Sequence, residues 1–247
     1  MNAPDRVLYE THSHTPLCKH AVGEPEEYAQ TAYARGLKGY TVTCHNPMPD
    51  NFSPGVRMQR AEFPQYLELV QRARATWAGK VDVRLGLECD YFAGFEHWLE
   101  EQVRWASFDY VLGSVHPQLR EFRERFWTGD PLEFQTAYFD QLATAAETGF
   151  FDCLAHPDLV KNETVRDWRP SLVLDVSRRA LDRIAATGIA MELNTSGANK
   201  KIPQMNPFPE MLREMSERGI PVVIGADAHA PSRVGAVSYT HLTLPTS

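Results

Sequence analysis

The sequence predicts an α/β fold, a distorted barrel of seven strand-then-helix units. Apolar β-type runs alternate with helical segments along the chain, and this alternation implies parallel strands joined by right-handed crossovers. Polar side chains follow the first to fifth strands and the seventh. An open sheet gathers ligands at a switch point between two strands, whereas a barrel brings the carboxyl ends of all strands to one face. Six contributing strands therefore favour the barrel.

The first three strands each run into a polar residue. The apolar run from Val7 predicts a short strand, and residues 39–43 and 81–87 predict two more because they are rich in β-branched residues or alternate at period two. Proline and acidic residues begin a helix near residue 24 that ends at a glycine, residue 36. A second helix is expected from about Arg57 to Trp77.

The second half repeats the same order. Strands are expected over 110–115, 151–155, 189–193 and 221–225, and helices over about 131–148, 172–186 and 210–218. The strand over 189–193 is followed by a polar loop, 194–197, that contains no histidine. No repeat or linker divides the chain.

Composition excludes several classes of protein. The chain has 247 residues, close to the roughly 250 of a single α/β barrel. Its formal net charge is −7, and it has no basic stretch, so stable binding of nucleic acid is not expected. No run of about 18 apolar residues and no signal-peptide pattern occurs, so we expect a cytoplasmic protein without a membrane span.

The four cysteines form no CxxC pair and are expected to be free thiols. The sequence does not indicate an oligomeric state.

Histidines mark the strand ends. His12 and His14 are two residues apart, so on an extended segment both imidazoles can reach one ion, although such a pair can also merely face solvent. Only His97 and His241 lie away from predicted strand ends. The side chains that follow strands are His12, His14, His20, His45, Glu88, His116, His156, Asp227 and His229. At about three or four protein ligands per ion, this set predicts a site for two to three divalent ions such as Zn, Mn or Fe.

These motifs resemble those of the polymerase and histidinol phosphatase (PHP) family, whose fold is a distorted seven-stranded β/α barrel around three metal ions. The match in order and spacing extends from Tyr9 to about Gly235. The phrases at 11–18, 156–161 and 192–197 are most similar to the histidinol-phosphate phosphatase branch.

The resemblance implies a ligand set for each ion. His12, His14, Glu88 and Asp227 would hold the first ion; Glu88, His116 and His156 the second; and His20, His45 and His229 the third. One position departs from the family, which usually has Asp where Cys44 stands. If that Asp only orients the next histidine, its loss should weaken the third ion alone. The Cys44 thiol could act as a soft ligand or pack as a small apolar side chain.

Three divalent ions and two carboxylates leave an excess of positive charge that suits a phosphate ester. We expect hydroxide held between two ions to attack phosphorus, with Glu88 bridging those ions and Asp227 or His229 passing a proton to the leaving oxygen. The candidates for phosphate contact are Lys161, Asn194, Ser196 and Arg233.

The resemblance implies a phosphomonoesterase that hydrolyses L-histidinol phosphate to L-histidinol and phosphate in histidine biosynthesis. Two alternatives remain open at this point. One is a PHP phosphoesterase acting on a nucleotide or an oligonucleotide end, and the other is a catalytically silent metal-binding module.

The end of the chain departs from the barrel pattern. We expect the barrel domain to occupy residues 1–237, incomplete at its C-terminal end, and the β-branched segment 238–247 to be a non-native tail, which discounts His241 as a ligand. The alternative is a natural C-terminal strand.

Overall fold

The computed structural model describes residues 8–236. The predicted tail, with His241, and the first seven residues lie outside this range. No helix of the described part is both long and apolar enough to cross a membrane.

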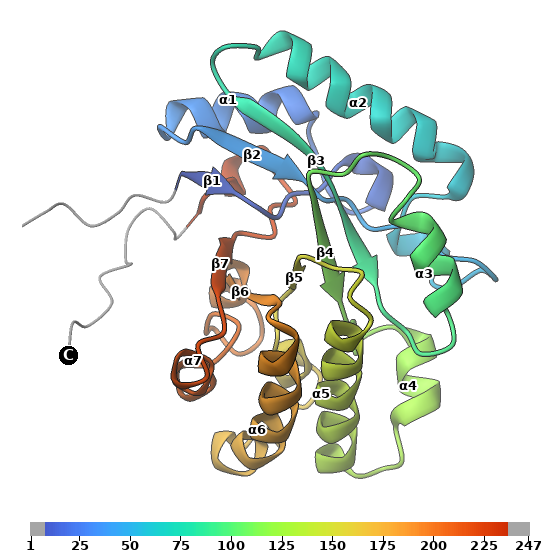
Figure 1. The fold of residues 1–247 in the computed structure, drawn as a ribbon, viewed down its shortest axis with the longest axis vertical. Coiled ribbons are helices and arrows are strands. Elements are labelled where there is room, and N and C mark those ends of the chain that lie inside the picture. Colours follow the sequence, from blue (N-terminus) through green and yellow to red (C-terminus); the bar gives the residue numbers. More distant parts are fainter. Residues whose placement is uncertain (1–7, 237–247) are drawn as a thin grey trace, which may run out of the picture.

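Seven parallel strands form one sheet in chain order (Figure 1). They are β1 (Tyr9–Glu10), β2 (Gly39–Val42), β3 (Asp82–Asp90), β4 (Tyr110–Ser114), β5 (Cys153–Leu154), β6 (Ala190–Asn194) and β7 (Val222–Gly225). Beyond β1 and β7, Ser13 pairs with Ala228 in a parallel bridge. The Ala228 amide donates to the His12 carbonyl at 2.9 Å, and the His14 amide donates to the Ala228 carbonyl at 2.9 Å. These bonds close the sheet, which confirms the predicted distorted barrel.

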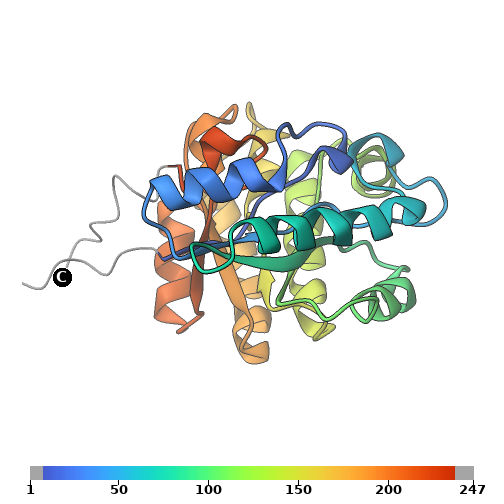
Figure 2. The same ribbon diagram turned by 90° about the horizontal axis from the view of Figure 1, so that it is seen from above.

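The helices lie outside the sheet, and Figure 2 shows α1 and α2 running across it beside the first three strands. Proline occupies the first or second position of α1, α2, α5, α6 and α7, where the missing amide proton is not needed. The helices are α1 (Pro25–Ala34), α2 (Phe63–Thr76), α3 (Glu96–Gln102), α4 (Arg120–Phe126), α5 (Pro131–Glu147), α6 (Pro170–Thr187) and α7 (Pro209–Glu217).

Three details differ from the sequence-based expectation. The second helix begins at Phe63 and not near Arg57, because a capping box between Gln59 and Glu62 starts a separate 3₁₀ turn before it. Two short helices, α3 and α4, were not predicted. Glu88 lies within β3, which pairs with β4 as far as Asp90, and so does not follow that strand as predicted.

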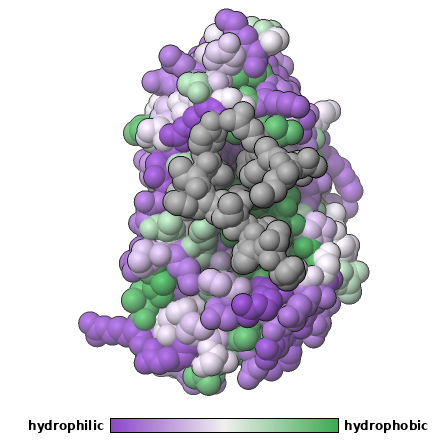
Figure 3. Space-filling view, turned by 90° about the vertical axis from the view of Figure 1, so that its left-hand side faces the viewer, coloured by the Kyte–Doolittle hydropathy of each residue, from purple (hydrophilic) through white to green (hydrophobic). Residues whose placement is uncertain are grey.

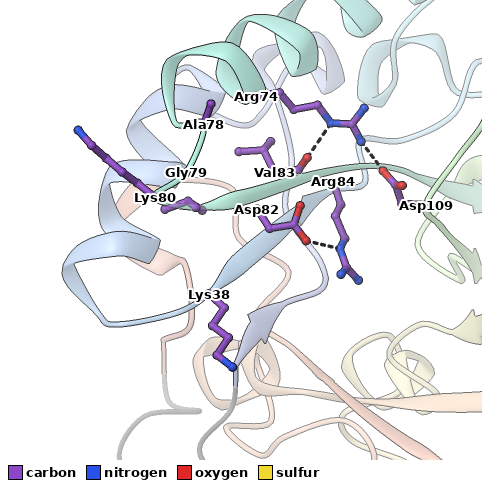
Figure 4. Close-up of a pocket in the computed structure, with 10 residues that line it drawn as sticks. Lys38, Arg74, Ala78, Gly79, Lys80, Asp82, Val83, Arg84 and Asp109 are labelled. Carbon is purple, nitrogen blue, oxygen red and sulfur yellow. Dashed lines mark hydrogen bonds and ion pairs between the residues drawn. The ribbon is translucent and has the colours of Figure 1, made fainter.

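At the end of the barrel where the strands begin, there is a hollow of about 840 Å³. Figure 4 shows it at the amino ends of β2 and β3. Its lining includes four cationic side chains and two carboxylates, and the two carboxylates pair with arginines. Arg84 Nε lies 2.8 Å from Asp82 Oδ2, and Arg74 pairs with Asp109. Figure 3 shows a face of the molecule that is mostly hydrophilic, with small apolar areas between. The histidines predicted to bind metal lie elsewhere, at the carboxyl ends of the strands.

Candidate metal centre

A cavity of about 390 Å³ opens at the carboxyl ends of the strands. Because parallel strands end on one face of a barrel, residues far apart in sequence meet there. The cavity is lined by His20, His45, His116, Gln118, His156, Leu159, Ser196, Asn199, Lys200, Asp227, His229 and Arg233.

The four predicted ligands of the first ion converge beside this cavity. His12 Nε2 lies 3.3 Å from Glu88 Oε2 and 3.6 Å from Asp227 Oδ1. His14 Nε2 lies 3.1 Å from Asp227 Oδ1 and 3.5 Å from Glu88 Oε2. Two imidazole nitrogens and two carboxylate oxygens thus face a common point.

The other oxygen of Glu88 faces the predicted second position. Glu88 Oε1 lies 3.0 Å from His156 Nε2 and 3.5 Å from His116 Nε2. One carboxylate therefore presents Oε2 to the first group and Oε1 to the second. This is the geometry that a bridging ligand requires.

In the third predicted group, two histidines face each other and the third, His45, is turned toward Glu88. His20 Nε2 and His229 Nε2 are 3.0 Å apart. His45 points its Nδ1 at Glu88 Oε2, 2.8 Å away, and its ligand atoms also group with those of His14 and His229 within 4.8 Å. His45 therefore lies between the third group and Glu88.

Buried polar atoms at this centre lack hydrogen-bond partners within the described residues. They include His12 Nε2, His45 Nδ1 and Glu88 Oε2, although each lies within 4 Å of another ligand atom. An unsatisfied buried polar atom is costly, so such atoms need an explanation. Cations held between them would satisfy all three, so the residues fit a group of divalent ions.

Charge coupling within the centre shifts the pKa of several groups. Burial alone would raise the pKa of Glu88, but the facing His45 and His12 hold it well below its usual value. Burial would likewise raise the pKa of Asp227, which His12, Lys200 and His229 hold far below normal. Both carboxylates are therefore ionised at neutral pH, as metal ligands must be.

A second layer of carboxylates orients the histidines, and these carboxylates were not among the site residues predicted from the sequence. Glu192 Oε1 binds His12 Nδ1 at 2.8 Å, which leaves His12 Nε2 directed into the centre. Asp90 binds His116 Nδ1 and pairs with the buried Arg57 at 2.5 Å. Glu192 is the only charged residue of β6, and this was a signal available in the sequence. Asp90 had no such signal, because β3 contains three other charged residues.

Cys44, two residues after the end of β2, is fully buried. Its sulfur accepts a hydrogen bond from Thr15 Oγ1 at 3.2 Å and lies 3.6 Å from the Thr15 carbonyl. Its ligand atom groups with those of His14 and Cys18 within 4.8 Å.

The four phosphate-contact candidates occupy different places. Ser196 and Arg233 line the cavity. Lys161 does not, because it is fully buried with its Nζ 3.0 Å from Asp158 Oδ2 and 2.7 Å from a backbone carbonyl. Asn194 is also buried, and its Oδ1 accepts from Ser196 Oγ at 2.6 Å. The geometry therefore speaks against direct phosphate contact by Lys161 and gives Asn194 a role in holding the loop.

Three polar side chains of the cavity, Gln118, Asn199 and Lys200, were not predicted from the sequence. Lys200 reaches Asp227 Oδ2 at 3.5 Å, and Gln118 lines the wall after β4. All three lie beyond the strand-end positions at which site residues were expected, so no local pattern pointed to them.

Fold and site define the class: the chain belongs to the PHP domain family, whose model matches residues 10–196. Within that class, a Deinococcus radiodurans protein named "Probable histidinol-phosphatase" is 39% identical over 238 residues, which cover 92% of this chain and 88% of the relative.

Two solved structures share the fold. A Listeria monocytogenes structure described as a "putative histidinol phosphatase hisK" has a TM-score of 0.83 at 20% identity, and the match covers 94% of this chain and 99% of that one. The Lactococcus lactis histidinol phosphate phosphatase, solved with zinc, L-histidinol and phosphate, has a TM-score of 0.77 at 19% identity, with coverages of 92% and 88%.

Proposed function

We propose that this chain is a metal-dependent phosphomonoesterase that hydrolyses L-histidinol phosphate to L-histidinol and phosphate. The observation that carries the proposal is the convergence of nine predicted ligands at one end of the barrel, with Glu88 presenting one oxygen to each of two groups. The likeness to a histidinol-phosphatase over most of the chain supports the choice of substrate.

Two to three divalent ions would be held here, and when bound they supply Lewis acidity, an activated water and positive charge for the phosphate. The histidines and carboxylates of the three groups hold and space those ions. Zinc is supported by the zinc-containing Lactococcus structure and by the histidine-rich donor set.

Asp227 serves better as a ligand than as a proton donor. Its low pKa keeps it ionised, and its Oδ1 already faces His14. The pKa of His229 is raised: burial opposes the shift, but Asp227 outweighs it. Of the two predicted proton donors, only His229 could carry a proton near neutral pH, and it could do so only while its Nε2 holds no metal.

The phosphate end of the substrate would meet the cationic wall of the cavity. Lys200 and Arg233 both line it, and Ser196 Oγ lies 3.2 Å from Asp227 Oδ2, next to the centre. Charge-assisted hydrogen bonds from these groups suit a phosphate dianion. We assign the activity to a single barrel domain that includes all of these residues.

Phosphate release from a panel of phosphomonoesters by purified, metal-reconstituted protein tests the proposal. We expect histidinol phosphate to be hydrolysed with a kcat/KM at least a hundredfold above that of an aryl phosphate. Lys200→Ala should raise KM for the phosphate ester, whereas Lys201→Ala, whose lysine pairs with Glu163 outside the cavity lining, is the matched control. Equal turnover of both substrates would reject the substrate assignment. No turnover of any phosphomonoester by fully metal-loaded protein would reject the proposal that the chain is an enzyme.

A further inference from the structure

Cys18 lies at the end of a 3₁₀ turn, Pro16–Cys18, that follows the His12–His14 segment. Thr15 caps this turn, and Lys19 then takes a left-handed conformation with φ of 71°, which reverses the chain. The Cys18 side chain is fully buried. The reversal brings His20 back beside the sulfur of Cys18.

The two histidines beside Cys18 are held with their Nε2 atoms facing each other. His20 Nδ1 is 2.7 Å from the Cys18 carbonyl, and His229 Nδ1 is 3.0 Å from the Asp227 carbonyl. A carbonyl only accepts, so each Nδ1 carries the proton and each Nε2 presents a lone pair. These lone pairs are 3.0 Å apart, an arrangement that a shared cation stabilises.

The sulfur of Cys18 completes this pair. Its Sγ and the ligand atoms of His20 and His229 all lie within 4.8 Å of one another. In a tetrahedral zinc site with bonds of about 2.0–2.3 Å, neighbouring ligand atoms are roughly 3.5 Å apart. Small side-chain adjustments therefore suffice to place all three on one ion.

Cys44 is the other thiol that could bind an ion here, since its sulfur lies within 4.8 Å of that of Cys18. It groups with His14 and Cys18. Its sulfur is already engaged by Thr15 through the hydroxyl at 3.2 Å and the carbonyl at 3.6 Å. Cys18 is thus the thiol that faces both histidines.

We propose that Cys18 Sγ is a ligand of the third metal ion, together with Nε2 of His20 and of His229. Binding breaks the S–H bond and forms a metal–sulfur bond, and the proton passes to solvent. A thiolate favours zinc, cobalt or cadmium over manganese at this position. The inference rests on metal binding by this centre, as the proposed function does, but not on the identity of the phosphate ester.

Cobalt substitution of the full chain tests this inference without relying on activity. A cobalt–thiolate bond produces a sulfur-to-metal charge-transfer band in the near ultraviolet, which oxygen and nitrogen ligands do not give. We expect the band in wild-type protein, its loss in Cys18→Ser, and its retention in Cys44→Ser. Cys153→Ser is the matched control, because Cys153 is equally buried but lies in β5.

Two outcomes would overturn the inference: cobalt-loaded wild-type protein without the band, or a band lost in Cys44→Ser and kept in Cys18→Ser. X-ray absorption on zinc-loaded wild-type protein needs no variant, so it decides the matter even if Cys18→Ser fails to fold. A zinc–sulfur distance of about 2.3 Å supports the inference, and its absence rejects it. Phosphate release is assayed separately, so a wrong substrate assignment leaves this result unaffected.

Discussion

At the scale of single residues, Glu88 is the point where the candidate ion sites meet. Its two oxygens face His12 and His14 on one side and His116 and His156 on the other, and the side chain is almost completely buried. Substitution by alanine would remove a ligand from two ions and leave the histidines to repel one another. No single histidine has the same effect, since each belongs mainly to one group.

We therefore predict that Glu88→Ala lowers kcat/KM for phosphate release at least as much as any single histidine substitution, by roughly a thousandfold or more. His97→Ala is the control, because His97 is exposed on α3, where it pairs with Glu101. Elemental analysis should show fewer than two bound ions in Glu88→Ala. Wild-type metal content and activity in this variant would contradict the bridging role.

Glu192 acts on the centre through His12. Its Oε1 accepts from His12 Nδ1 at 2.8 Å, so Glu192→Gln would weaken the bond that fixes the tautomer and orientation of the ring. We predict a 10–100-fold loss of metal affinity, measured by competition with a chelator, because such supporting groups typically contribute that much. Glu214→Gln, at a surface ion pair with Arg178, should leave the affinity unchanged.

At the scale of secondary-structure elements, strand β4 depends on Gly113 to approach the segment before β5. A Cβ at Gly113 would lie 2.4 Å from Cδ2 of the Phe151 ring. Neither residue can easily move aside, because Gly113 is hydrogen-bonded within the sheet and the Phe151 side chain is buried. Packing of these two strands therefore requires the absence of a side chain at this position.

We predict that Gly113→Ala lowers the free energy of unfolding by about 1–3 kcal/mol, the usual cost of overpacking. Gly55→Ala is the matched control, since a Cβ there meets nothing within 4 Å. Denaturant unfolding measures both. Adding Phe151→Leu should restore part of the loss if the ring is the cause.

At the scale of the whole molecule, Glu10 holds the first and last parts of the barrel together. Its Oε1 accepts from the amides of His12 at 3.0 Å and Ala226 at 2.7 Å, and its Oε2 accepts from the Gly235 amide at 2.7 Å. Burial raises the pKa of Glu10 to about 7, although these three amides oppose the shift. The closure of the barrel is thereby coupled to protonation.

The sign of the pH effect follows from that pKa. Between about pH 4.5 and 7 the folded protein binds more protons at Glu10 than the unfolded chain does, so stability falls as the pH rises through this window. We predict that the stability of metal-free wild-type protein relative to Glu10→Gln declines by about 3 kcal/mol across the window and is constant above it. Parallel pH profiles of the two proteins would show that Glu10 does not titrate there.

Most of the secondary structure could be predicted from the sequence. The periodicity and the breaker residues predicted seven strands and the main helices, because these signals are local. The short helices α3 and α4 lack a long periodic stripe and were not predicted, and the predicted second helix wrongly includes the 3₁₀ turn before α2.

For the centre, the sequence by itself determined the class of protein and which residues were candidate ligands, since their order along the chain is a property of sequence. Only the tertiary structure decided which atoms face one another: that Glu88 divides its oxygens, that Lys161 turns to Asp158, and that Glu192 orients His12. The physical reason is barrel closure. It brings strand ends separated by more than two hundred residues within a few ångströms, so contacts between them depend on register and packing, which no local pattern encodes.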